Sequence, residues 1–489
     1  MLNGRAKIFT NFKEINDDNI EYVLGQAYPL FVTNSTDIEI LYNFYRGIQP
    51  ILQRTKNIRP EICNKMVVNH AYEIANFRIG YLLEKPIQFV ARKQNTNVDM
   101  LNRYNDFNEI EDKESKDIEI ENSRAICGTA YRLALPNKKY TKGSKTESPY
   151  NISTIDPTTG FVVYSSDIGE KPLLGVVVLI ERIDSKRVIK LQAWTDTTYY
   201  VFDFSNKVME VKKPHTYGMI PLIEYPNNEE RMGVFEPAID ILNSANTVLN
   251  NAIDGIEQFI QAIMVFKNVE VTAEMLKTLK ELGAINISDS GEIKANVDYL
   301  SQELNQEQVL KLVEYLISCA YKICACPQQK SGGNGNNGAT EIHDGWTEVE
   351  AKVQKDEARF RKSEKEFIKL TLNYAKTLTY GEVDLSSADI TVKFTRRNYE
   401  NLTQKVNALV LMLQNGKIDP RLAFATCGLF SDPEEAYLAS EKYVKEQAQV
   451  SQNGGDPNAT TKWFHTKSSQ RYMHHSKSRV WMWNQIRWW

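Results

Sequence analysis

The sequence has few of the features that mark secreted or membrane-embedded proteins. Its 489 residues contain six cysteines, too few for a disulfide framework in a chain of this length. No apolar run reaches the roughly 18 residues that a membrane-spanning helix requires. The first residues are polar and charged, unlike the apolar core of a secretory signal peptide. We therefore expect a protein that is made and used in the cytoplasm and has no membrane partner.

The sequence also lacks an excess of charge of one sign. Its formal net charge is -3 at pH 7, whereas a protein that grips DNA along its whole surface is usually clearly basic. Any contact with DNA should therefore be local or weak. With 42% hydrophobic residues the chain can build sizeable cores, and its length predicts roughly two to four domains.

Residue sets for catalysis or metal binding are missing too. Cys319, Cys324 and Cys326 lie on or at the end of one predicted helix, but zinc favours Cys-x-x-Cys pairs or nearby histidines, and the nearest is His343. The segment 333–338 matches the G-x-G-x-x-G pattern of dinucleotide-binding loops, but a helix and a proline precede it where that fold needs a strand. We expect no enzyme activity, no cofactor and no metal.

Apolar periodicity divides the first half of the chain into helices and then strands. Spacings of three and four residues predict helices over much of residues 1–120. From about Ala130, β-branched and aromatic runs separated by turns predict an antiparallel meander that ends near Pro226. The expected strands are Tyr150–Ile155, Phe161–Tyr164, Gly175–Glu181, Val188–Trp194 and Thr198–Phe204. The predicted fold class is α+β, mainly helical.

A long helix is expected over residues 236–263, with a narrow apolar stripe that suits lengthwise packing on other helices. The rest of it carries Asp and Asn, and no Lys or Arg occurs between Arg231 and Lys267. One interpretation is an ordinary helix with a polar face. The other is a surface kept free of cations, so that a passing polyanion finds nothing to grip.

The second half of the chain alternates between helices and short irregular segments. A small α/β module over 264–303 is followed by a helix to about residue 325 and by the uncharged segment Ser331–Gly338. Trp346, Phe360 and other apolar residues at seven-residue spacing predict a helix from Asp344 to about Leu378. A strand at Ile390–Phe394 and two or three short helices over 398–450 complete the prediction.

The last residues differ in composition from the rest. Five of the seven tryptophans and six Lys or Arg residues lie after residue 461, with no acidic residue among them. Aromatic and basic residues together suit single-stranded nucleic acid or an aromatic-binding partner. The alternative is an extension without a function of its own.

Several stretches together resemble the portal protein family of tailed bacteriophages, in the branch typified by Bacillus siphophage portals. They occur in the family's order over about 450 residues, although each alone is weak. In the second stretch Glu84 stands where the family often has Gly. The stretches are Tyr42–Ile51, Gly80–Phe89, His215–Asn228, Phe235–Asn243 and Asp344–Ala351.

This resemblance implies a ring, usually a dodecamer, whose subunits have a wing, stem, clip and crown. The implied regions are 1–235 for most of the wing, 236–263 and 304–327 for two stem helices, 264–303 for the clip, 328–343 for a tunnel loop, 344–397 for a long wing helix and strand, and 398–450 for the crown. The tail 451–489 lies outside the resemblance.

The resemblance further implies a structural protein of the virion that forms the DNA channel at one capsid vertex. Its partners would be double-stranded DNA, the terminase large subunit, the major capsid and scaffolding proteins and the head-tail adaptor. The channel candidates on the first stem helix are Asp254, Glu257 and Gln261. The tunnel-loop candidates are Lys330, Gly332, Gly333, Asn334, Gly335, Asn336, Asn337 and Gly338. The alternatives are another virion ring component, such as an adaptor, or a nucleic-acid enzyme.

Overall fold

The structure is a computed structural model. It describes residues 2, 4–92, 96–183, 186–260, 263–267, 272–275, 277, 296–300, 306–327, 337–378, 383–395, 402–430 and 433–452. The chain divides into two compact units, Met1–Arg396 and Arg397–Trp489. Both helices and strands are present, which confirms the expected mixed fold class.

Helices dominate the first 127 residues, as the apolar periodicity predicts. Two of them begin at asparagines whose side chains accept a backbone N–H, at Asn69 and Asn97. The last of them ends at Gly128, whose φ of 83° is the left-handed conformation that glycine adopts most readily. The elements are β1 (Ile8–Thr10), α1 (Ile20–Tyr45), η1 (Pro50–Gln53), α2 (His70–Leu82), β2 (Gln88–Ala91), α3 (Val98–Ile110) and α4 (Lys113–Cys127).

A six-stranded sheet follows, in the order β1-β5-β6-β7-β8-β9. From β5 to β9 each strand pairs antiparallel with the next, which confirms the predicted meander. At the opposite edge β1 pairs parallel with β5, a long-range pairing that local sequence patterns do not reveal. The strands are β5 (Gly160–Ser165), β6 (Pro172–Ile183), β7 (Lys186–Trp194), β8 (Thr198–Asp203) and β9 (Val208–Pro214).

The predicted strand Tyr150–Ile155 forms as β4, but it does not belong to the meander. It lies in a separate sheet of order β10-β3-β4, with β3 (Thr129–Pro136) and β10 (Leu222–Pro226). The first six residues of β3 are buried, so both of its faces and both of its edges need partners. One edge is taken by β4 and the other by β10, which returns from far along the chain.

Alternation along β6 places its side chains in two different cores. Val176 and Val178 pack with Leu24 and Phe31 of α1, whereas Val177 packs on the other face with Leu222 of β10. This two-residue period is that of a strand buried on both faces. The meander is therefore held between α1 and the smaller sheet.

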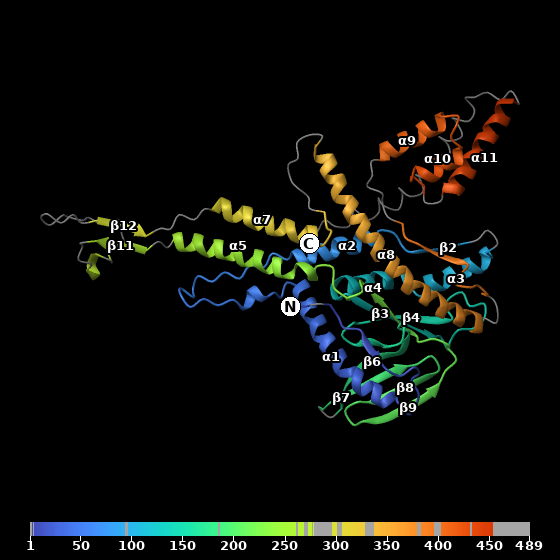
Figure 1. Cartoon of the computed structure of the whole chain (residues 1–489), viewed down its shortest axis with the longest axis horizontal. Helices are drawn as coiled ribbons and strands as arrows, with labels where there is room; N and C mark the ends of the chain where they lie inside the picture. Colours follow the sequence, from blue (N-terminus) through green and yellow to red (C-terminus); the bar gives the residue numbers. More distant parts are fainter. Residues whose placement is uncertain are drawn as a thin grey trace, which may run out of the picture. The chain divides into compact units, whose positions relative to one another are not determined.

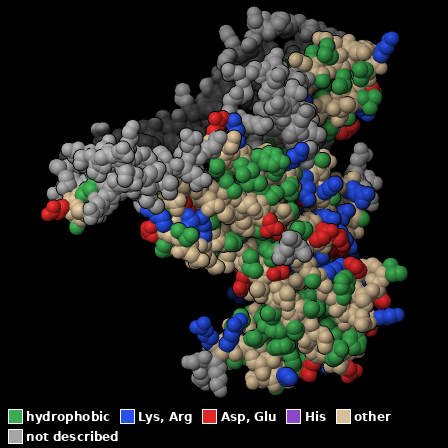
Figure 2. Space-filling view, turned by 60° about the vertical axis from the view of Figure 1, so that its left-hand side comes forward, with side chains coloured by type: hydrophobic (Ala, Val, Ile, Leu, Met, Phe, Trp, Pro, Cys, Tyr) green, Lys and Arg blue, Asp and Glu red, His purple; other side chains and the backbone are tan. Residues whose placement is uncertain are grey.

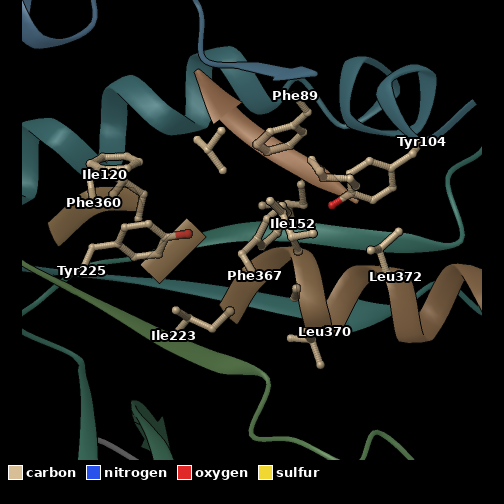
Figure 3. Packing of buried hydrophobic residues seen from close by; sticks show 14 of the residues in the cluster. Phe89, Tyr104, Ile120, Ile152, Ile223, Tyr225, Phe360, Phe367, Leu370 and Leu372 are labelled. Carbon is tan, nitrogen blue, oxygen red and sulfur yellow. The ribbon is translucent and has the colours of Figure 1, made fainter. Parts of the chain in front are cut away.

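The largest core surrounds α8 (Asn337–Leu378), a helix of 42 residues. Its seven-residue repeat supplies Phe360 and Phe367, both fully buried, as the sequence predicts. Figure 3 shows Phe367 of this helix beside Ile152 of the β10-β3-β4 sheet, and Phe89 belongs to the same core. The strand β13 (Ile390–Lys393) pairs antiparallel with β2 over the same core. The core around α8 therefore includes residues from both the early and the late part of the first unit's sequence.

The structure corrects the expected start of this helix. It begins at Asn337 and not at Asp344, so Asn337 and Gly338, predicted in the tunnel loop, have helical backbone. Residues 339–342 read Ala-Thr-Glu-Ile, which includes good helix formers. A helix already nucleated over many turns also tolerates single unfavourable residues at its end.

Four buried charges link α4, β3 and α8. Arg132 Nη1 lies 2.6 Å from Glu364 Oε1, and Arg132 Nη2 contacts Asp117 Oδ1. Lys113 Nζ lies 2.7 Å from Asp117 and 3.1 Å from Glu364. The Tyr225 hydroxyl donates to Glu364 at 2.9 Å. Two cations thus balance two carboxylates, which is the condition under which buried charges are tolerated.

The second unit contains three helices among its described residues. They are α9 (Leu402–Gln414), α10 (Pro420–Thr426) and α11 (Pro433–Gln452), close to the segments predicted over 398–450. α10 packs against both α9 and α11. Phe424 stacks on Phe430 at 5.2 Å and meets Tyr437 edge-on, so aromatic contacts form its core.

Candidate functional site

Within the first unit, a pair of helices carries the chain away from the sheets and back. η2 (Glu236–Ala238) leads into α5 (Ile239–Ile260), and α7 (Gln306–Ile323) packs along α5. Beyond them β11 (Ile263–Lys267) pairs antiparallel with β12 (Asn296–Leu300). Figure 1 shows the two helices side by side, with the two strands past their ends. We call this structure the arm.

The predicted apolar stripe of α5 anchors the base of the arm. Ala238, Leu242 and Ala245 are buried, and the first two pack with Ala320 and Tyr321 near the end of α7. The same cluster includes residues of α1 and α2. The arm is thus fixed to the body of the unit by a continuous apolar core.

One polar edge of α5 binds the loop that connects η1 to α2. Asn246, Asn250 and Asp254 recur every four residues, and each side-chain oxygen accepts a backbone N–H from the segment 64–68. The donors are Val68 at 3.0 Å, Met66 at 2.7 Å and Asn64 at 2.8 Å. Asn250 also donates to the Met66 carbonyl oxygen at 2.7 Å. We call this set of contacts the amide ladder.

The amide ladder works because two backbone periods agree. Four residues along a helix advance by about 6 Å, and two residues along an extended chain advance by about 6.6 Å. The side chains of α5 therefore meet every second residue of the segment, as a neighbouring strand would. An extended segment that would otherwise leave backbone groups unpaired is held on the helix by side chains.

Asp254 ends the amide ladder with two ion pairs. Its Oδ2 lies 3.0 Å from Arg54 Nη1 and 2.5 Å from Lys56 Nζ, both on the loop. The residue is 1% exposed. Burial raises the pKa of Asp254, but the contacts from Lys56 and the hydrogen bonds from Asn64 outweigh it, so this pKa lies below its usual value. The carboxylate is charged at neutral pH and neutralised by the loop.

These contacts change the expectation drawn from the sequence of α5. The helix itself has no Lys or Arg, yet Arg54 and Lys56 from a distant segment lie directly on it. Asp254 is therefore neither exposed nor remote from cations. Glu257 lies one turn further on and is partly exposed.

The remaining predicted site residues lie mostly outside the described residues. These are Gln261 on the stem side and, in the tunnel loop, Lys330, Gly332, Gly333, Asn334, Gly335 and Asn336. Asn337 and Gly338 begin α8, and only their backbone is described. Among the described residues, no tunnel-loop candidate contacts Asp254.

Sequence reasoning missed a second, exposed polar stripe on α5. It comprises Asp240, Ser244, Thr247, Asn251 and Gln258, all of which are exposed. Only the first is charged. The sequence predicts a single polar face opposite the apolar stripe of α5, but the structure separates a buried edge that binds the loop from this exposed edge. A stricter count of the three- and four-residue spacing would have distinguished the two.

The described residues hold no group of three or more His, Cys, Asp or Glu side chains arranged to bind a metal. Cys324 and Cys326 are buried, and burial raises the pKa of each thiol to about 12. Both thiols are therefore protonated and unreactive at neutral pH.

Charge and hydrophobicity over the described surface are mixed. On the face drawn in Figure 2, described Lys and Arg side chains lie among Asp, Glu and apolar ones, and several of them gather at the right of the middle of the view. In the described part of the chain, no helix is long and apolar enough to span a bilayer.

Comparison with known proteins gives the family. The family described as "Phage portal protein, SPP1 Gp6-like" matches residues 33–453, which leaves the tryptophan-rich tail outside. A relative named "Portal protein", from Bacillus phage SPP1, is 23% identical over 292 residues, covering 55% of this chain and 57% of the relative. That match spans little more than half of the relative's length. Because the family match covers most of the chain, the chain belongs to the SPP1-type family of phage portal proteins, whose role is structural and not enzymatic.

Proposed function

We propose that this chain is the subunit of a portal ring of about twelve copies at one vertex of a phage capsid. Double-stranded DNA would pass through the ring during packaging and ejection, and the ring would join head to tail. The observation that carries the proposal is the arm, because two packed helices with a small strand pair beyond them are what a stem and a clip require. An adaptor ring subunit, the main alternative, would not need this structure.

The remaining parts of the chain follow from this proposal. α5 and α7 would be the stem helices, and β11 with β12 would belong to the clip. The rest of the first unit would form the wing, with α8 as its long helix. The second unit would form the crown, and the part of the predicted loop segment that precedes α8, residues 328–336, would supply the tunnel loop.

For the channel surface we propose Glu257 and Gln261, together with the exposed polar stripe of α5. Small uncharged side chains such as Ser244 and Thr247 give phosphates no fixed cation to bind. A cation-rich channel would bind DNA through counterion release and slow its passage. Asp254 would serve the channel indirectly, by holding Arg54 and Lys56 on the helix.

The proposed partners follow from the place of a portal in the virion. The terminase large subunit would dock during packaging and supply the energy from ATP. The major capsid and scaffolding proteins would surround the ring, and a head-tail adaptor would bind it later. The subunit would pass from the host cytoplasm, where it is made, into the assembled virion.

A charge change on α5 tests the channel surface. Glu257→Lys places one cation per subunit on the proposed wall, which becomes a ring of cations in the assembly. Packaging by particles carrying this variant should slow, most at low salt, because added cations bind phosphates. Asp99→Lys on α3 is the matched control, since Asp99 is exposed in the first turn of that helix. Equal packaging rates for the two variants would contradict the placement of Glu257.

A further inference from the structure

The hairpin formed by β6 and β7 extends past its neighbours in the sheet. β6 pairs with β5 only as far as Val177, and β7 pairs with β8 only from Lys190 onward. Ile189 still accepts the Phe204 N–H at 2.9 Å, and beyond it the two strands pair only with each other among the described residues. There Arg182 lies directly opposite Arg187, and both side chains are exposed.

Two like charges directly opposite on paired strands repel each other and weaken the hairpin. Among the side chains that the structure describes, no carboxylate pairs with either guanidinium. Glu181, the neighbouring carboxylate, lies 3.2 Å from Lys190, which also contacts Glu210. A pair of arginines without a compensating carboxylate among the described side chains favours a negatively charged partner outside the chain.

An apolar residue beside the arginines indicates that this partner is a protein. Ile180 lies two residues from Arg182, so both share one face of β6, and Ile180 is 49% exposed. Duplex DNA is usually gripped by many cations along its phosphates, whereas an apolar residue flanked by arginines is typical of a protein interface. We call Ile180, Arg182 and Arg187 the basic hairpin patch.

A surface of opposite charge occurs on α4 of the same chain. Ile118 is 41% exposed, and Asp112, Glu114 and Glu119 around the start of the helix are exposed as well. Lys116, the basic residue between them in sequence, is half-buried and lies 3.4 Å from Glu111. We call Asp112, Glu114, Ile118 and Glu119 the acidic corner. Like the basic hairpin patch, the acidic corner places one exposed apolar residue among charged residues. The charges of the two surfaces have opposite signs.

The two surfaces cannot meet within one chain. Figure 1 shows α4 and the end of the β6-β7 hairpin at separate places in the first unit. Two different surfaces that complement each other are what a head-to-tail ring needs, because each subunit offers one surface to each neighbour. The available partner of matching chemistry is therefore a second copy of the same chain.

We propose that the basic hairpin patch of one subunit binds the acidic corner of the next. This proposal rests on the ring proposed above and names one of its subunit contacts. The test uses the full-length chain in three forms. One carries Arg182→Glu with Arg187→Glu, one carries Asp112→Lys with Glu114→Lys and Glu119→Lys, and the third combines all five changes.

Ring formation is measured by native mass spectrometry over a dilution series at low salt. Each partial variant should need at least about tenfold more protein to assemble half of its chains, since two reversed exposed pairs change affinity by about that factor. The combined variant should recover much of the loss, and added salt should reduce the differences. Lys171→Glu with Lys213→Glu, two exposed residues that lie just before β6 and on β9, is the control and should assemble normally.

The outcomes separate this contact from the ring itself. Normal assembly of both partial variants, or no recovery in the combined variant, would overturn the contact while leaving the portal proposal intact. Normal assembly of the hairpin variant with weaker retention of duplex DNA would assign the patch to nucleic acid and also overturn it. If the unchanged chain forms no ring under any condition, the proposed function itself fails. Circular dichroism of each variant checks that the exposed substitutions leave the fold unchanged.

Discussion

The amide ladder on α5 makes a prediction that local chemistry specifies in detail. Asn250 is fully buried at its centre. Its Oδ1 accepts the Met66 N–H at 2.7 Å, and its Nδ2 donates to the Met66 carbonyl at 2.7 Å. Asn250→Ala removes both of these hydrogen bonds to the loop, and also the one that Nδ2 donates to the Asn246 carbonyl of its own helix at 2.7 Å. The change creates no new charge. The loop segment 64–68 should then open more often from the helix.

The size of the effect follows from the two hydrogen bonds to the loop, because the third lies within α5 and its loss affects the open and closed states alike. Each contributes about 1 kcal/mol net, so local opening should become easier by about 2 kcal/mol, or roughly 30-fold. Met66 is 43% exposed, so water can reach its backbone after the change and no larger penalty is expected. Alanine favours helix more than asparagine does, but α5 stays helical in both the open and closed states, so this preference cancels.

Hydrogen exchange resolved to single residues measures this opening. The amides of Asn64, Met66 and Val68 should exchange roughly 30-fold faster in Asn250→Ala. Ser244→Ala is the control, because its exposed hydroxyl bonds only to the Asp240 carbonyl of its own helix among the described contacts, and it should leave these three rates unchanged. If Asn250→Ala leaves the rates unchanged, the amide ladder does not hold the loop.

Four further substitutions test the body of the first unit. Glu364→Gln leaves two buried cations with one carboxylate between them and should cost about 3–5 kcal/mol of stability, seen as a lower midpoint of thermal unfolding. Burial raises the pKa of Glu224, but Arg231 outweighs it and the pKa lies below its ordinary 4.5. The stability from this carboxylate is therefore present above pH 4.5 and lost as pH falls through the lower value. Arg231→Gln should destabilise most near pH 7 and progressively less below about pH 4.5, and a loss independent of pH would contradict the pairing. Gly128→Ala would place Cβ 2.0 Å from the Arg231 carbonyl oxygen at a φ of +83° and should prevent stable folding, whereas Gly80→Ala, with open space around it in α2, should stabilise by about 1 kcal/mol.

Local sequence patterns predicted most of the elements and few of their long-range partners. The helices around Ile74 and Phe360 and the strand at Ile152 follow from apolar spacing, which depends only on neighbours in sequence. The pairing of β10 with β3, which places β4 in a separate sheet, and the parallel pairing of β1 with β5 depend on segments far apart in the chain. Periodicity carries no information about such partners, so the meander was predicted and its separation from β4 was not.

The candidate site shows the same limit at the level of side chains. The polar residues of α5 were identified correctly, but the absence of Lys and Arg in its sequence did not mean an absence of cations around it. Arg54 and Lys56 lie about 200 positions away from Asp254 in the chain. Only the folded loop brings them together. The burial of Asn246 and Asn250 likewise depends on a segment that the helix sequence does not reveal.

The central claim is that this chain assembles into a ring with an open channel. Electron microscopy of the purified full-length chain, with top and side views of single particles, tests it most directly. The account predicts a closed ring of about twelve subunits, a central hole wide enough for duplex DNA, and a side view in which a narrow stem extends from a broader wing. A compact oligomer without a channel, or a flat ring without a stem, would contradict it.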